Sequence, residues 1–211
     1  MSDAELLRAW RRGDRRAGST LFNRYFDSIL RFFRTKVDDA VEDLVQQTFT
    51  ACVETRDRFR EESSFRTYLY AIAHNVLREF YRRRRRFGRY VNFEVESVVD
   101  LGAGPVTLAV AHAEQRLLLE ALRRIPIAHQ VILELYFWER FTGKEMGAFL
   151  DVPEDTARSR LRRAKALLID QLRALEIPPN LLESTLTDLD RWAESIREIL
   201  ARKLNKAPRE P

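Results

Sequence analysis

An arginine-rich stretch in the second half of the chain carries the side chains best suited to bind a ligand. Five cations and no acidic residue lie within residues 156–169. On a helix, Arg158 and Arg162 share one face, because residues four apart lie one above the other. Ser159 and Arg163 share the adjacent face. Such donors at the start of a helix can reach guanine edges and phosphates in a DNA major groove, so the spacing predicts a surface that reads duplex DNA.

The residues before this stretch predict the turn that would present it to DNA. Thr142 and Glu145 have the spacing of a capping box, in which hydroxyl and carboxylate satisfy free backbone amides at a helix start. That helix should end near Leu150, and the turn at residues 151–153 should open another, since proline is tolerated in a first turn. Short helix, tight turn and longer helix make a helix-turn-helix. The alternative, a basic face that is merely solvated, is disfavoured by this spacing.

A second candidate surface alternates aromatic and basic residues along a helix predicted to start near residue 64. Exposed aromatic rings can stack on unpaired bases while arginines hold the strand, so the pattern indicates a single-strand platform. Alternatively, the tyrosines pack beneath a neighbouring loop, and for Tyr70 the two interpretations are even. The five consecutive arginines at 82–86 favour phosphate contact over simple solvation. The face consists of Tyr70, His74, Arg78, Tyr81 and Arg85.

Charge and cysteine content narrow the class of protein. Lysine and arginine outnumber aspartate and glutamate by 37 to 32, which favours a polyanionic partner. The single cysteine, Cys52, cannot form an internal disulfide and lies on an apolar helix face, so we expect a buried, inert thiol in a reducing compartment. No apolar run approaches the ~20 residues of a membrane span, and no hydrophobic signal segment starts the chain. We therefore expect a cytoplasmic protein without membrane insertion.

Apolar residues recur every three or four positions, which predicts an all-α protein. A helix over residues 14–33 carries two adjacent apolar stripes and should lie inside a bundle, with Phe26 among the buried residues. A helix over residues 38–56 should bury its apolar face and leave an outer face without paired opposite charges. That outer face consists of Asp43, Gln46, Gln47, Thr50 and Glu54. The helix near residue 64 should pack Phe65, Leu69, Ile72, Val76 and Phe80.

Helical periodicity is lost over residues 87–104, where three glycines and three acidic residues predict a flexible acidic linker. At ~3.3 Å per residue it reaches roughly 60 Å, comparable to about 17 base pairs, so two domains could touch separate DNA sites. The predicted fold is two small helical domains: an N-terminal helical bundle over residues 1–86, and a C-terminal four-helix domain with the helix-turn-helix over residues 105–173.

A C-terminal extension follows over residues 174–211. After Pro178-Pro179 the pattern predicts an amphipathic helix from about residue 180, with one apolar stripe that needs a partner surface. Two roles are equally favoured for this helix. It could bury the stripe against the second domain as structural support, or it could fold back over a binding face and regulate it. The stripe consists of Leu182, Leu186, Leu189, Trp192, Ile196, Ile199 and Leu200.

Nothing in the sequence predicts catalysis. His74, His112 and His129 are far apart, without cysteine or acidic companions at metal-ligand spacing. A glycine-rich phosphate loop is absent from the sequence, and the glycines at 102–104 suit a hinge. We therefore expect no active site, no cofactor and no metal.

Four strings in the sequence resemble the extracytoplasmic-function (ECF) group of bacterial sigma factors. The first is EDLVQQTF at residues 42–49, and the second is FRTYLYAIAHN at residues 65–75. In the second half, KEM at 144–146 and RSRL at 158–161 continue the likeness. The resemblance covers roughly residues 5–86 and 116–172. It implies that core RNA polymerase and promoter DNA, duplex and melted, are partners, and it leaves open an anti-sigma partner.

The resemblance also implies roles for individual residues. Binding to the polymerase core falls on the outer face already described: Asp43, Gln46, Gln47, Thr50 and Glu54. Binding to the −10 element, with capture of a flipped base, falls on Phe59, Arg60, Glu61, Ser63, Tyr70, His74, Asn75, Arg78, Tyr81, Arg82 and Arg85. Binding to the −35 element falls on Thr156, Arg158, Ser159, Arg160, Arg162 and Arg163.

The chain departs from the family pattern at three positions. Tyr68 replaces a usual tryptophan, Gly18 stands where a packed aromatic is common, and Asp155 replaces a frequent glycine. Two rival classes compete with the sigma interpretation. A stand-alone helix-turn-helix regulator would leave the outer polar face and the aromatic strip unexplained. A nucleic-acid enzyme lacks any residue set able to do the chemistry.

Overall fold

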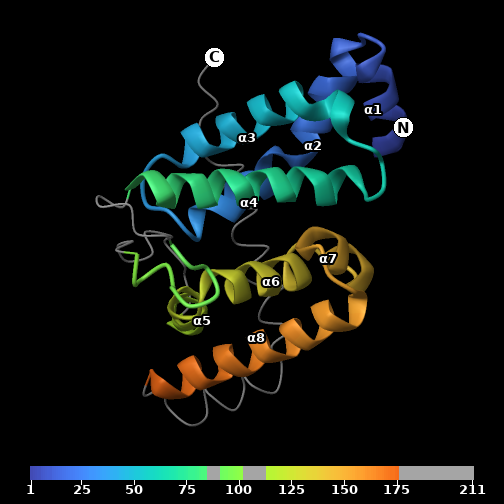
Figure 1. The fold of residues 1–211 in the computed structure, drawn as a ribbon. Helices are drawn as coiled ribbons and strands as arrows, with labels where there is room; N and C mark the ends of the chain where they lie inside the picture. The colour runs from blue at the N-terminus through green and yellow to red at the C-terminus, as the bar shows by residue number, and fades with distance from the viewer. Residues whose placement is uncertain (85–90, 102–112, 176–211) are drawn as a thin grey trace.

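The computed structural model describes residues 1–84, 91–101 and 113–175, and within them the chain is helical (Figure 1). The all-α prediction is confirmed. Arg85, most of the predicted tail and the two ends of the predicted linker lie outside the described residues. The helices are α1 (Asp3–Arg11), α2 (Arg15–Arg34), α3 (Val41–Thr55), the 3₁₀ helix η1 (Arg56–Arg58), α4 (Phe65–Arg84), α5 (Ala113–Arg124), α6 (Ile127–Phe137), α7 (Gly143–Leu150) and α8 (Glu154–Ala174).

The first four helices form the N-terminal bundle. A capping box starts α1, in which the Ser2 hydroxyl accepts from the Glu5 amide and the Glu5 carboxylate accepts from the Ser2 amide. Trp10 of α1 then lies against Gly18 of α2, where a Cβ atom would come within 2.6 Å of the indole nitrogen. The missing side chain at Gly18 thus makes room for an aromatic ring supplied by α1, because the ring and a Cβ atom cannot share that space.

Burial on α2 differs from the sequence expectation at Phe26. Leu21, Ile29 and Phe33 of α2 are fully buried, as predicted, and Cys52 of α3 lies in the same core. Burial raises the pKa of the Cys52 thiol to about 12. Phe26, which we expected inside, is 44% exposed and stacks on Phe49 at 6.2 Å between ring centroids. The second apolar stripe of α2 therefore ends at the surface beside α3.

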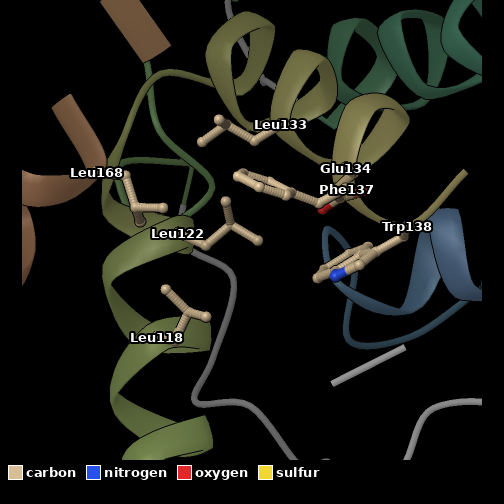
Figure 2. Close-up of a pocket in the computed structure, with 7 residues that line it drawn as sticks. All are labelled: Leu118, Leu122, Leu133, Glu134, Phe137, Trp138 and Leu168. Atoms are coloured by element: carbon tan, nitrogen blue, oxygen red, sulfur yellow. The ribbon is translucent and has the colours of Figure 1, made fainter. Parts of the chain in front are cut away.

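The C-terminal domain consists of α5 to α8. Helix α6 is buried on almost every side, because α5, α8 and the first domain surround it. Between α5, α6 and α8 a cavity of about 20 Å³ remains (Figure 2). That volume holds no more than a water-sized molecule, so the cavity is a packing gap rather than a ligand site. Its lining residues are Leu118, Leu122, Leu133, Glu134, Phe137, Trp138 and Leu168.

The two domains lie against each other, with α6 and α7 beneath α4 (Figure 1). Residues 91–101 of the predicted linker are packed, which the sequence did not lead us to expect. The Phe93 carbonyl accepts from the Ala128 amide at 2.9 Å, and the Phe93 ring reaches across to His74 and Tyr81 of α4. This segment therefore joins the two domains instead of only spanning them. No helix among the described residues is long and apolar enough to cross a membrane.

Candidate nucleic-acid interface

The predicted helix-turn-helix is present as α7 and α8. The capping box is confirmed: the Thr142 hydroxyl accepts from the Glu145 amide at 3.2 Å, and the Glu145 carboxylate accepts from the Thr142 amide at 2.9 Å. Asp151 ends α7 in the left-handed conformation at φ 53°. The turn is tight enough that a Cβ atom on Gly147 would lie 2.8 Å from the Val152 carbonyl oxygen. Helix α7 therefore holds the start of α8 at close range.

Helix α8 turns its cations to solvent. Its apolar face packs Ala157, Leu161, Ala164, Leu168 and Leu172 into the domain. Of the predicted duplex-reading residues Thr156, Arg158, Ser159, Arg162 and Arg163 are exposed, and Arg160 is half-buried. All but one of the predicted donors thus lie on the open face that a major groove can receive.

Arg158 is not free on that face. Its Nη2 lies 2.6 Å from Oε1 of Glu154, one turn earlier, and its Nε donates to the same oxygen at 3.0 Å. The pair covers Gly143, where a Cβ atom would lie 2.6 Å from Glu154 Oε1. Arg158 must therefore leave Glu154 before it contacts a base, whereas no ion pair of Arg162 or Arg163 is seen among the described residues.

An open pocket lies where the turn after α3 meets α4. Its volume is about 410 Å³, and Phe59 and Tyr68 form one wall, stacked at 4.3 Å between ring centroids and 16° between planes. Tyr68, which stands where tryptophan is usual, also shares a short hydrogen bond with the Thr55 hydroxyl. Aromatic rings beside polar groups suit a nucleobase taken out of its stack. The lining residues are Arg58, Phe59, Arg60, Glu62, Ser63, Thr67, Tyr68, Ala71 and Ala148.

The pocket contains only some of the residues predicted for it. Phe59, Arg60 and Ser63 line it, as expected, whereas Asn75 does not. Glu61 points elsewhere: it adopts φ 58° and accepts from Arg11 of α1 at 2.8 Å. Sequence reasoning also missed Tyr68, Thr67 and Ala148, although the aromatic at position 68 on the same helix was a signal that could have been used.

Arg11 fixes the turn that forms the pocket wall. Its Nε donates to the Arg56 carbonyl at 3.0 Å, and its Nη2 donates to the carbonyls of Arg56 and Phe59. Because one guanidinium holds two successive parts of the turn, the fork geometry of arginine is needed there. The first helix, which carries none of the predicted DNA contacts, thus positions Phe59.

The aromatic strip predicted on α4 is not exposed in this conformation. Tyr70 is 1% exposed, which favours the alternative that it packs beneath other parts of the chain, and Tyr81 is 4% exposed, so the expectation of an open stacking ring is wrong there. The physical reason is packing by other parts of the chain: Phe141 of the second domain meets Tyr70 edge-on at 5.5 Å, and Phe93 of the linker segment meets Tyr81 at 6.1 Å. Tyr70 also packs on Phe32 inside its own bundle.

His74 lies between two aromatic rings, one from the linker segment and one from α7. Its centroid is 5.7 Å from Phe93 and 5.4 Å from Phe149 of α7. Burial, followed by the charges of Arg78 and Lys36, lowers the pKa of His74 to about 4. His74 is therefore a neutral ring at neutral pH. Asn75, Arg78 and Arg82 remain exposed on the same helix, and Arg82 pairs with Glu79 at 2.6 Å.

The predicted polymerase-binding face of α3 is open. Asp43, Gln46, Gln47, Thr50 and Glu54 are all exposed. Beside them lie two exposed apolar side chains that sequence reasoning did not include: Val53 is 40% exposed and Phe26 44%. Apolar side chains bordered by polar ones are the usual composition of a protein–protein contact surface.

Comparison with known proteins finds a matching family model for each half of the chain. Residues 21–87 match the family model of Sigma-70 region 2, and residues 115–168 match that of Sigma-70, region 4. The ECF RNA polymerase sigma-E factor of Escherichia coli strain K12 is 25% identical over 184 residues, which cover 83% of this chain and 96% of the relative. That of Haemophilus influenzae is 22% identical over 184 residues, 83% of this chain and 97% of the relative.

Solved structures share the fold. CnrH, solved in complex with the cytosolic domain of CnrY, superimposes with a TM-score of 0.60 at 23% identity, covering 82% of this chain and 97% of that one. The sigma factor RpoE from Bartonella quintana, solved with the anti-sigma factor NepR, gives a TM-score of 0.51 at 20% identity, covering 72% and 96%. The chain therefore belongs to the sigma-70 family, as a member of its ECF group of RNA polymerase sigma factors.

Proposed function

We propose that this chain docks on core RNA polymerase through α3, reads the −35 element as duplex with α8, and captures an unpaired base of the −10 element in the pocket beside α4. The observation that carries the proposal is the exposed row of donors on α8, which belongs to the part of the chain that matches Sigma-70, region 4. The polymerase would do the chemistry, and the chain itself would not be an enzyme.

The pocket supports the −10 assignment. It combines the stacked rings of Phe59 and Tyr68 with the hydroxyls of Ser63 and Thr67, and it opens beside the arginines of the turn. Stacking on an aromatic contributes ~1–3 kcal/mol per base, but only for a base that has left the duplex. The chain alone has no means of melting DNA beyond its charge, so strand separation requires the polymerase.

The α3 face supports polymerase docking. Five exposed polar residues adjoin Phe26 and Val53, and no ion pair of Asp43 or Glu54 is found within the described ranges. Polar groups that have no partner in the free chain can pair with a protein surface without first breaking an internal ion pair. We further propose that the protein works in the cytoplasm, and that an anti-sigma protein or the C-terminal extension controls it.

The experiment reconstitutes holoenzyme from core polymerase and selects active promoters from a library randomised at both elements. Arg162→Ala should change base preference at one element, because an arginine fork discriminates a guanine by ~1–3 kcal/mol. Arg173→Ala is the matched control and should leave base preference unchanged. Arg173 is an exposed arginine near the end of the same helix, where it pairs with Asp170. Equal, sequence-independent losses from both variants would contradict the assignment of α8.

A further inference from the structure

The contact between the two domains contains a buried ion pair. Lys36, at the end of α2, and Glu134 of α6 are 0% and 3% exposed, and Nζ of the lysine donates to Oε2 of the glutamate. The other carboxylate oxygen accepts from the Thr35 hydroxyl and from Gln130 Nε2, each at 2.9 Å. These four residues, Lys36, Glu134, Thr35 and Gln130, come from both domains and form one hydrogen-bonded polar cluster, which we name the polar latch.

Further ion pairs surround the polar latch. Arg31 of α2 meets Glu139 at 3.0 Å, and Arg123 of α5 meets Asp38 at 3.5 Å. Arg66 of α4 donates to the Glu139 carbonyl at 2.8 Å and to the Glu145 carboxylate at 2.5 Å. Every one of these pairs joins one domain to the other, and apolar contacts such as that of Tyr70 with Phe141 lie at the same interface.

The charges of the polar latch depend on each other. Burial lowers the pKa of Lys36 and raises that of Glu134, and in both cases desolvation outweighs the attraction of the partner. A buried charge that loses its partner is strongly unfavourable, whereas replacing both charges by apolar groups of similar size is often neutral. Opening the domains would return both groups to water. Removing one partner would therefore raise the free energy of the closed form, in which the remaining charge is buried, and not that of the open form.

The closed form also covers residues of α4 that the resemblance assigned to the −10 element. Phe141 and Phe149 of the second domain lie on Tyr70 and His74. A compact chain of this length has a radius of gyration of ~17 Å and is about 45 Å across, less than the roughly 60 Å that separates two DNA sites 17 base pairs apart. A closed chain therefore cannot contact two DNA sites that far apart.

We propose that the polar latch of Lys36, Glu134, Thr35 and Gln130 holds the two domains together in the free chain and must separate before the chain takes its promoter-binding form. That opening permits promoter binding rests on the proposed function. The closing of the domains by the latch can be tested without DNA or polymerase. Loss of either charge should open the chain, and loss of both should let it close again.

The test measures energy transfer between dyes on the full-length chain, attached at Ser19→Cys in the first domain and Asp170→Cys in the second. Cys52 stays unlabelled, because it is fully buried and its pKa is raised to about 12. Lys36→Met and Glu134→Leu should each shift the closed-to-open ratio toward open by a factor of about 10² or more, since each leaves one buried charge alone. The double variant should regain the parent's transfer, and Lys144→Met, at an exposed lysine of α7, is the matched control.

Circular dichroism of each variant separates opening from unfolding. If a single variant unfolds, Arg66→Ala replaces it, because Arg66 is partly exposed and its loss removes contacts to both Glu139 and Glu145. Arg66→Ala should then lower transfer with helicity retained. Unchanged transfer in the folded variants, or a double variant as open as the single ones, would overturn the latch. A chain that closes and opens as expected but directs no transcription would instead overturn the proposed function.

Discussion

Acid should weaken the closed form through His74. The ring is neutral and half-buried, with a pKa of about 4 against an ordinary value of 6.5. A group whose pKa is depressed in the folded state contributes stability that is complete above pH 6.5 and is lost as the pH falls toward 4, because only the exposed ring takes up a proton. At pH 5 the loss amounts to roughly 2 kcal/mol.

Neighbouring groups have pKa shifts of their own, so their contributions to the pH dependence of stability must be separated from that of His74. Arg78 and Lys36 face the ring and oppose its protonation. His129, whose pKa burial also lowers, acts in the same direction, while Glu134, whose pKa burial raises, acts in the opposite one. His74→Gln removes one titration and leaves the others, so the difference between parent and variant isolates the histidine.

The assay is chemical denaturation of parent and His74→Gln, each at pH 7.5 and pH 5. The parent should lose roughly 2 kcal/mol more than the variant over this interval. Energy transfer between the two domains, measured in the same samples without denaturant, should fall with acid in the parent and less in the variant. Equal losses of stability in both proteins would refute the burial of a neutral His74 between Phe93 and Phe149.

Three further predictions concern other parts of the molecule. Gly18→Ala should lower the free energy of unfolding by about 1 kcal/mol, because the clash with Trp10 outweighs the helix propensity gained, and a raised melting temperature would contradict the packing. Phe26→Ser should change stability little but weaken binding to core polymerase by about tenfold, measured by fluorescence anisotropy; unchanged affinity would remove Phe26 from the docking face. Deletion of residues 178–211 should alter promoter activity while both domains stay folded, and loss of the cooperative thermal transition would make this extension a scaffold instead.

The features that sequence reasoning predicted are those fixed by near neighbours. The Thr142–Glu145 capping box depends on residues three apart, and the exposed row on α8 follows from helical spacing alone. The turn at Asp151 is equally local. Such features need no knowledge of where the rest of the chain lies, so they could be derived before the structure was known.

The features that were missed depend on contacts across the whole chain. Lys36 and Glu134 are 98 residues apart, and neither reads as a core residue, because isolated charges are rarely buried. Tyr70 belongs to an alternating aromatic and basic strip, and only the arrival of Phe141 decides that it is covered. Phe26 fits an apolar stripe, yet within the described structure only part of it is covered, by Phe49 of α3, and it stays 44% exposed.

The central claim is that the chain recognises promoters as a subunit of RNA polymerase, and permanganate reactivity of unpaired thymines tests it most directly. A promoter from the library would be probed with the chain alone, core polymerase alone, and both together. We predict reactive thymines at the −10 element only with both, and loss of this reactivity with the Arg60→Ala variant of the pocket. Promoter opening by core polymerase without the chain, or tight sequence-specific binding by the isolated chain at physiological salt, would contradict the claim.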